Sequence, residues 1–238
     1  ADLLPPELGR RLAGAARPEE VSRTAGRRVA GRAATGLRIT PRDPATTISR
    51  IEIWADRATG LPLRAEVTPR GTDQPVLRTA FLDLDLRAPV PPPTFTPPLG
   101  SNVSVVTAPD IAGRLDELAP YLLPDTLAGL PRRVRLAGVA ADAGTATYGD
   151  GYALVVVLPL PADLTAQVLR RLEGSPAKDV DVGRPAATVL GIDTPLVNAL
   201  VVRGGRRGYL IAGTVGRPTL ELAARTLLDS PPRRAAGR

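Results

Sequence analysis

The chain has 238 residues, 43% of them hydrophobic, with a single Trp and two Phe, and a formal net charge of +7. The absence of cysteine and histidine excludes thiolate and imidazole metal sites, cysteine nucleophiles and histidine-based triads. The basic residues are spread evenly, 15 against 11 acidic in residues 1–107 and 16 against 13 in residues 108–238, which is typical of a solvated surface and does not indicate nucleic-acid binding.

The first predicted elements are a short helix and a strand. Pro5-Pro6-Glu7 is a typical helix start, and Leu4, Leu8 and Leu12 follow at a spacing of one turn. Residues 27–40 then alternate between apolar side chains and Arg, which predicts one strand with bends at two glycines. The apolar positions are Val29, Ala33, Leu37 and Ile39, and the bends are expected at Gly31 and Gly36.

A hairpin follows. Residues 48–54 are rich in β-branched residues, and residues 61–67 alternate strictly between apolar and polar side chains. Asp56 to Gly60 supplies the turn between them. A further strand is predicted over 76–86, after a turn at 70–75. The N-terminal part is therefore expected to be a meander of about four antiparallel strands, closed by an extended proline-rich edge at 88–100.

Three stretches in this part resemble a known fold family. They are a strand end from Leu37 to Pro41, a W-x-D-x-x-T-G-L-P-L-R hairpin from Trp54 to Arg64, and an F-T-P-P-x-G ending from Phe95 to Gly100. Their order and spacing over residues 27 to about 105 resemble the LolA-like fold, and most closely the sigma-factor regulators RseB and MucB. The resemblance implies a curved antiparallel half-barrel with covering helices and an apolar space that accepts acyl chains.

The sequence offers an apolar set for such a space. Aliphatic side chains of one parity give an acyl chain a dry surface without directional contacts. The predicted concave, ligand-binding face consists of Leu37, Ile39, Ile51, Ile53, Leu63, Ala65, Val67, Leu82 and Leu84. The alternative is that these nine side chains are an ordinary core beneath helices.

Residues 108–230 are expected to form a second, smaller α+β domain, with 231–238 as a disordered tail. The domain boundary is placed at 107. RseB-like regulators also carry a smaller C-terminal domain. The predicted helices cover 110–118, 162–172 and 219–228, and the predicted strands cover 134–140, 152–158, 187–190, 196–202 and 209–215. The strand at 152–158 is so uniformly apolar that burial on both faces is expected.

Three polar motifs could suggest sites. Asp83 and Asp85 could bind Ca²⁺ or act as acid and base, but a solvent-facing edge is the favoured interpretation. The glycine-rich stretch 204–208 lacks the Lys-Ser/Thr of a phosphate-binding loop and is predicted to be a hairpin turn. Residues 147–152, TYGDGY, could form a recognition patch, although Asp-Gly first indicates a chain reversal.

The function expected from these observations is a non-enzymatic, extracytoplasmic regulator or sensor of the RseB/MucB type, without cofactor or metal. Its expected partners are a lipid or acyl chain and a membrane-anchored anti-sigma-type protein. The alternative is a LolA-like lipid or lipoprotein carrier, and a carboxylate-based enzyme is disfavoured because no convergent acid and base are visible. Because the chain starts at Ala and only about 26 residues precede the matched segment, we also expect an N-terminal piece with a targeting or tethering segment to precede it.

Overall fold

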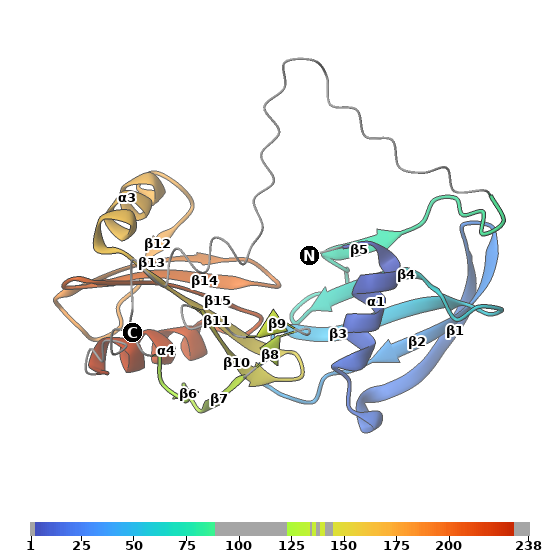
Figure 1. The fold of residues 1–238 in the computed structure, drawn as a ribbon, viewed down its shortest axis with the longest axis horizontal. Coiled ribbons are helices and arrows are strands. Elements are labelled where there is room, and N and C mark those ends of the chain that lie inside the picture. The colour runs from blue at the N-terminus through green and yellow to red at the C-terminus, as the bar shows by residue number, and fades with distance from the viewer. Residues whose placement is uncertain (1–2, 89–122, 134, 137–138, 141–144, 231–238) are drawn as a thin grey trace, which may run out of the picture.

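The computed structural model describes residues 3–88, 123–133, 135–136, 139–140 and 145–230, which form two α+β units lying side by side (Figure 1). Each unit is built on an antiparallel sheet with helices against it. The mixed α+β class expected from the sequence is therefore confirmed. Four predicted features lie outside the described residues: the proline-rich stretch after 88 with its Phe95–Gly100 ending, the helix at 110–118, the boundary at 107 and the tail 231–238.

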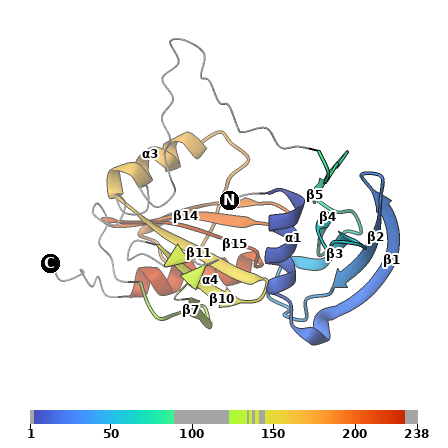
Figure 2. The same ribbon diagram turned by 45° about the vertical axis from the view of Figure 1, so that its right-hand side comes forward.

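The first unit is an open five-stranded sheet in the order β1-β2-β3-β4-β5. Helix α1 crosses one face of this sheet, and the strands β1 and β2 curve around it (Figure 2). A short 3-10 turn, η1, connects α1 to the sheet. The bounds are α1 Pro5–Gly14, η1 Pro18–Glu20, β1 Val21–Val29, β2 Arg32–Ile39, β3 Ile48–Asp56, β4 Pro62–Pro69 and β5 Leu77–Ala80.

The segment predicted as one strand over 27–40 is part of a hairpin. Strands β1 and β2 reverse at Ala30 and Gly31, whose φ angles of 49° and 74° are both left-handed, as in the two-residue turn typical of hairpins. Gly36 is not a bend. It lies inside β2 opposite a register irregularity of β1, where a Cβ would meet the Ala25 carbonyl oxygen at 2.7 Å. A close backbone approach requires this glycine.

One face of the first sheet is apolar and lies beneath α1. Strand pairing aligns Leu37 with Ile53 and Ile53 with Ala65, so these side chains share a face. Leu8 and Leu12 of α1 pack on the same cluster, whereas Leu4 at the helix start is 56% exposed. The cluster comprises Ile39, Ile48, Ile51, Ile53, Ala65, Val67 and Tyr152.

The strand predicted over 76–86 is much shorter than expected. Strand β5 ends at Ala80, and Leu82 is 96% exposed. The reason lies in the two aspartates of LDLDL: Asp83 accepts a hydrogen bond from the Leu84 N–H, and Asp85 accepts one from the Arg87 N–H. Such local bonds compete with a sheet ladder and stabilise a loop.

The second unit contains an eight-stranded antiparallel sheet with the order β12-β13-β14-β15-β11-β10-β7-β6, and a separate pair β8-β9. Where one strand was predicted over 134–140, the described residues form the two short paired strands β8 and β9. The strands are β6 Thr126–Leu127, β7 Leu130–Arg133, β8 Arg135–Leu136, β9 Val139–Ala140, β10 Ala146–Asp150, β11 Ala153–Leu160, β12 Lys178–Asp179, β13 Ala187–Asp193, β14 Asn198–Gly204 and β15 Arg207–Gly213, and the helices are α3 Ala162–Leu172 and α4 Arg217–Asp229.

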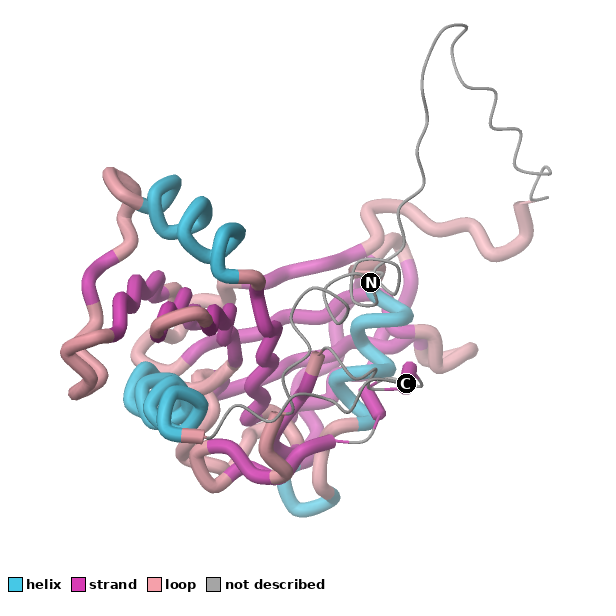
Figure 3. Tube along the Cα trace, turned by 60° about the vertical axis from the view of Figure 1, so that its left-hand side comes forward, coloured by secondary structure: helices cyan, strands magenta, loops and turns pink. Residues whose placement is uncertain are grey.

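Helices α3 and α4 lie on opposite sides of the second sheet (Figure 3). The main core lies under α4, where Leu220 and Leu227 pack against Val155 and Ile211. On the α3 side, Thr165 and Leu169 are the buried helix residues. Burial along β11 alternates between buried and half-buried positions, so this strand is not buried on both faces as predicted.

Candidate functional site

A cavity of about 630 Å³ lies between α1 and the apolar face of the first sheet, next to the turn joining β3 and β4. Its size falls in the range of small-molecule sites. Three structural elements supply most of the wall, and Leu86 completes it. The lining residues are Pro6, Gly9, Arg10 and Ala13 of α1, Leu37, Ile53 and Ala55 of the sheet, Thr59, Gly60, Leu61 and Pro62 of the turn and the start of β4, and Leu86.

Gly9 sets the distance between α1 and the sheet at this cavity. A Cβ on Gly9 would lie 2.7 Å from Pro62 Cβ and 3.6 Å from Ile53 Cγ2, so no larger residue fits without moving the helix. Ile53 belongs both to the cavity wall and to the packed cluster around Ile51, so the cavity lies next to that cluster.

The turn that forms one wall is held by Asp56. Its Oδ2 accepts hydrogen bonds from the Thr59 N–H (3.1 Å) and the Thr59 hydroxyl (2.7 Å), and Gly60 adopts a left-handed φ of 72°. Arg32 of β2 forms a bidentate pair with Asp56, with both distances 3.0 Å. The Arg32 guanidinium and the Thr59 hydroxyl lower the pKa of this buried carboxyl from its ordinary value of 3.8 to about 2.

Trp54, the first residue of the motif, connects the hairpin to β1 on the outer face of the sheet. Its indole Nε1–H donates to the Ala25 carbonyl at 3.1 Å. The guanidinium groups of Arg27 and Arg64 lie 4.9 and 5.7 Å from the ring centroid, within cation-π range. Trp54, Asp56, Thr59 and Gly60 of the motif therefore have structural roles.

The described wall of the cavity carries one ionisable side chain, Arg10. Its Nη2 donates to Glu7 Oε2 at 2.7 Å, and Arg11 donates to the other Glu7 oxygen. These two arginines lower the pKa of Glu7, with Arg11 the larger cause. The described wall thus combines mostly apolar side chains with one exposed cation that is paired with Glu7, an arrangement that suits binding and offers no acid and base pair for proton transfer.

The nine residues predicted for the ligand-binding face are distributed over several places. Leu37 and Ile53 line the cavity and also pack in the cluster beneath Leu8 and Leu12, which contains Ile39, Ile51, Ala65 and Val67 as well. Three do not lie on the concave face: Leu63 and Leu84 pack with the outer cluster around Trp54, and Leu82 is in solvent. Leu63 leaves the face because the register between β3 and β4 shifts between Trp54 and Ala55.

Sequence reasoning missed the wall that α1 supplies. Pro6, Gly9, Arg10 and Ala13 follow one another at helical spacing and lie beside the leucine stripe that the sequence analysis identified. The small residues among them, Gly9 and Ala13, are four positions apart and indicate close approach of the helix to its neighbour, which was the available signal.

The other predicted sites have structural roles. Tyr148 is fully buried, and its hydroxyl donates to the Pro124 carbonyl at 2.8 Å, while desolvation raises its pKa to about 12. Residues 204–207 form the β14–β15 turn, with Gly205 left-handed. Within the described ranges no cluster of acidic residues could hold a metal ion. No helix in the described part of the chain is both long and apolar enough to cross a membrane.

Comparisons with known proteins agree with the sequence resemblance. Residues 1–99 match the family model described as the MucB/RseB N-terminal domain. Among solved structures, MucB in complex with MucA(peri) is 23% identical, with a TM-score of 0.47 over 94% of this chain and 70% of that one. The MucA/MucB complex of Pseudomonas aeruginosa is 24% identical, with a TM-score of 0.44 over 99% and 74%, and MucB alone is 22% identical, with 0.44 over 90% and 69%.

No curated protein matches the sequence. The family assignment therefore rests on the sequence match, which covers α1, the whole first sheet and every residue that lines the cavity. Residues 1–99 are therefore similar to the MucB/RseB N-terminal domain.

Proposed function

We propose that this chain is a non-enzymatic extracytoplasmic regulator whose first unit binds the acyl chain of a lipid or lipoprotein and whose second unit contacts a membrane-anchored anti-sigma-type protein. The observation that carries the ligand half is the apolar cavity between α1 and the sheet. An acyl chain that enters such a space gains about 0.8 kcal/mol for each buried CH₂ group. Arg10, whose side chain is 71% exposed, could pair with an anionic headgroup in exchange for its exposed ion pair with Glu7.

The partner half of the proposal rests on the MucB/RseB match and on the presence of a second unit. Solved relatives include MucB bound to MucA(peri), which supports a protein partner for a protein of this type. A carrier of the LolA kind is the alternative, because the cavity alone would suffice for it. The second unit has a large core of its own, centred on Val155, Ile211 and Leu220, and a carrier function leaves it without a role.

The test of the ligand half is organic extraction of the purified protein after incubation with lipid vesicles, followed by mass spectrometry. We expect stoichiometric lipid on the native chain. Ala55→Leu fills the cavity without introducing charge, and we expect it to reduce retained lipid about tenfold or more, since it removes room for several CH₂ groups. The matched control is Ala186→Leu, an exposed position of the second unit.

Three outcomes separate the alternatives. Native protein that stays free of lipid, or equal retention by both variants, would rule out the cavity as the site. Capture of an anti-sigma-type membrane protein by the full chain supports regulation. Lipid transfer between vesicles without any captured protein supports the carrier.

A further inference from the structure

The two units are joined by a short buried ladder between residues 45–47 and 214–216. Thr46 and Val215 at its centre are 1% and 0% exposed. The ladder consists of an antiparallel bridge between Thr46 and Val215, a hydrogen bond from Thr47 N–H to the Thr214 carbonyl (2.9 Å) and one from Gly216 N–H to the Ala45 carbonyl (3.2 Å).

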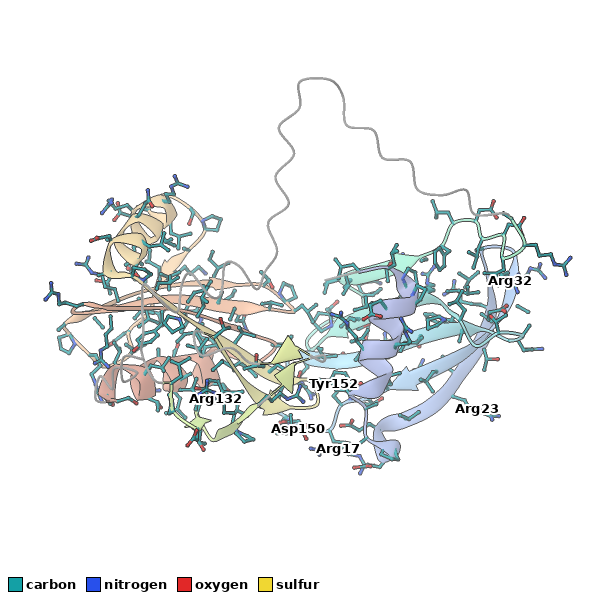
Figure 4. The ribbon with its side chains drawn as sticks, in the orientation of Figure 1. Arg17, Arg23, Arg32, Arg132, Asp150 and Tyr152 are labelled. Carbon is teal, nitrogen blue, oxygen red and sulfur yellow. The ribbon has the colours of Figure 1, made fainter. Side chains whose placement is uncertain are left out.

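Tyr152 of the second unit is part of the hydrophobic core of the first. It lies in the turn between β10 and β11, is 6% exposed, and packs in the cluster of Ile39, Ile51 and Ile53. Figure 4 places it at the junction of the two units, near the C-terminal end of α1. Its carbonyl accepts hydrogen bonds from the Thr46 hydroxyl (2.9 Å) and the Thr214 hydroxyl (2.6 Å), so its backbone is fixed to both strands of the ladder.

The Tyr152 hydroxyl caps helix α1. At the C-terminal end of this helix, Ala15 N–H donates to the Arg11 carbonyl and Ala16 N–H to the Ala13 carbonyl. The Leu12 carbonyl between these two acceptors receives its hydrogen bond from the Tyr152 hydroxyl, at 2.5 Å. Burial raises the pKa of this hydroxyl, so it stays a donor at neutral pH.

A second contact between the units is weaker. Arg17 Nη2 lies 3.0 Å from Asp150 Oδ2 (Figure 4). Arg133 shares the same carboxylate. The side chains of Arg17 and Asp150 are 55% and 69% exposed, and exposed ion pairs contribute little. Tyr152 is therefore the main link between α1 and the second unit.

We propose that Tyr152 couples the position of α1 over the cavity to the buried ladder between the two units. Gly9 has no spare room against Pro62, so an occupant that widens the gap must move α1. Leu12 lies one turn further along the same helix, and its movement acts on Tyr152, whose carbonyl is held by both strands of the ladder. The ligand in this inference is the acyl chain of the proposed function, but the mechanical link is testable without it.

The first experiment measures hydrogen exchange in the full chain carrying Tyr152→Phe. The ring stays in the core while the bond to Leu12 is lost, so we expect Ala15 and Ala16 amides to exchange roughly 2- to 10-fold faster. The matched control is Tyr148→Phe, which removes an equivalent hydroxyl-to-carbonyl bond inside the second unit and should leave α1 unchanged. Equal α1 exchange in the native chain and Tyr152→Phe would overturn the proposal.

The second experiment tests the reverse direction, because coupling between two sites is reciprocal. Gly9→Ala pushes α1 away from Pro62, and we expect faster exchange at the Thr47 and Gly216 amides. This increase should disappear when Tyr152→Phe is also present and persist with Tyr148→Phe. The proposed coupling is contradicted if exchange at Thr47 and Gly216 is equally fast with and without Tyr152→Phe. It is also contradicted if a folded Gly9→Ala variant shows no faster exchange at these amides. Should circular dichroism show that Gly9→Ala is unfolded, the Tyr152→Phe measurement decides alone.

The ligand arm uses a fluorescent C16 fatty acid as the probe. Binding together with faster exchange at Thr47 and Gly216 supports the coupling. Binding without any change in exchange at these amides would show that an acyl chain in the cavity does not act on the ladder. The proposed function would still stand in that case. If the fatty acid does not bind, the proposed acyl site fails, and the two substitution experiments still decide whether α1 and the ladder are linked.

Discussion

At the scale of single residues, the hairpin motif shows how a family signature follows from local chemistry. Asp56 holds the turn through Thr59 and holds β2 through Arg32, so one carboxylate fixes a wall of the cavity and its neighbouring strand. Gly60 is required because its φ of 72° is left-handed. The motif therefore places Pro62 against Gly9 of α1.

Asp56 should make the first unit sensitive to acid. A carboxyl whose folded pKa lies below its unfolded pKa stabilises the fold above the unfolded value and loses this contribution as pH falls through the folded value. With 3.8 and about 2 as the two values, we expect the loss between about pH 4 and pH 2. The urea concentration at the unfolding midpoint of the native chain should fall as the pH is lowered through this window. Asp56→Asn should be less stable at pH 6 and show a flatter dependence below pH 4, and parallel curves for the two proteins would contradict the assignment.

At the scale of elements, the alternation of apolar residues and the helical stripes predicted that a helix or strand is present better than they predicted where it begins and ends. Helix α3 occupies the predicted range, because Pro161 at its N-cap marks its start. Three of the strand predictions were wrong for a common reason. In each, a local deviation of the backbone interrupts the strand, and the alternation of apolar and polar residues does not reveal it. The Asp83 and Asp85 turns end β5, the irregularity at Ala55 moves Leu63 to the outer face, and the Ala30-Gly31 turn divides the first strand from the second.

The close approach at Gly36 gives the element-scale prediction. A Cβ there would lie 2.5 Å from Thr24 Cγ2 and 2.7 Å from the Ala25 carbonyl oxygen, so Gly36→Ala must push β1 away from β2. We expect it to lower the free energy of unfolding by about 1–3 kcal/mol. Gly14→Ala at the end of α1 meets no atom within 4 Å and should be neutral or stabilising by up to about 1 kcal/mol. Urea unfolding checks both, and equal stability of the two variants would contradict this account of β1.

At the scale of the whole molecule, the sequence indicates two units but not how they are joined. Tyr152 reads as a turn residue, and Thr46 as part of a loop, because nothing local marks a partner more than 100 positions away. The apolar cavity was hard to predict from sequence for the same reason. Two predicted residues lie in its sheet wall, but its helix wall depends on where α1 packs. Long-range placement is set by tertiary contacts, and a single sequence contains no periodic signal for them.

The buried ladder predicts that the two units unfold together. Trp54 lies in the first unit and reports on it alone, whereas far-UV circular dichroism reports on both, so the two probes should give coincident urea transitions in the native chain. Thr46→Val with Thr47→Val removes the hydroxyl bonds to Tyr152 and Leu196 and should cost about 0.5–1.5 kcal/mol for each bond. The Trp54 transition should then move to lower urea than the dichroism transition, because the first unit has the smaller core. Thr226→Val, which removes a hydroxyl bond inside α4, is the control and should keep the transitions coincident. Separate transitions in the native chain, or coincident ones in the double variant, would show that the ladder does not join the units energetically.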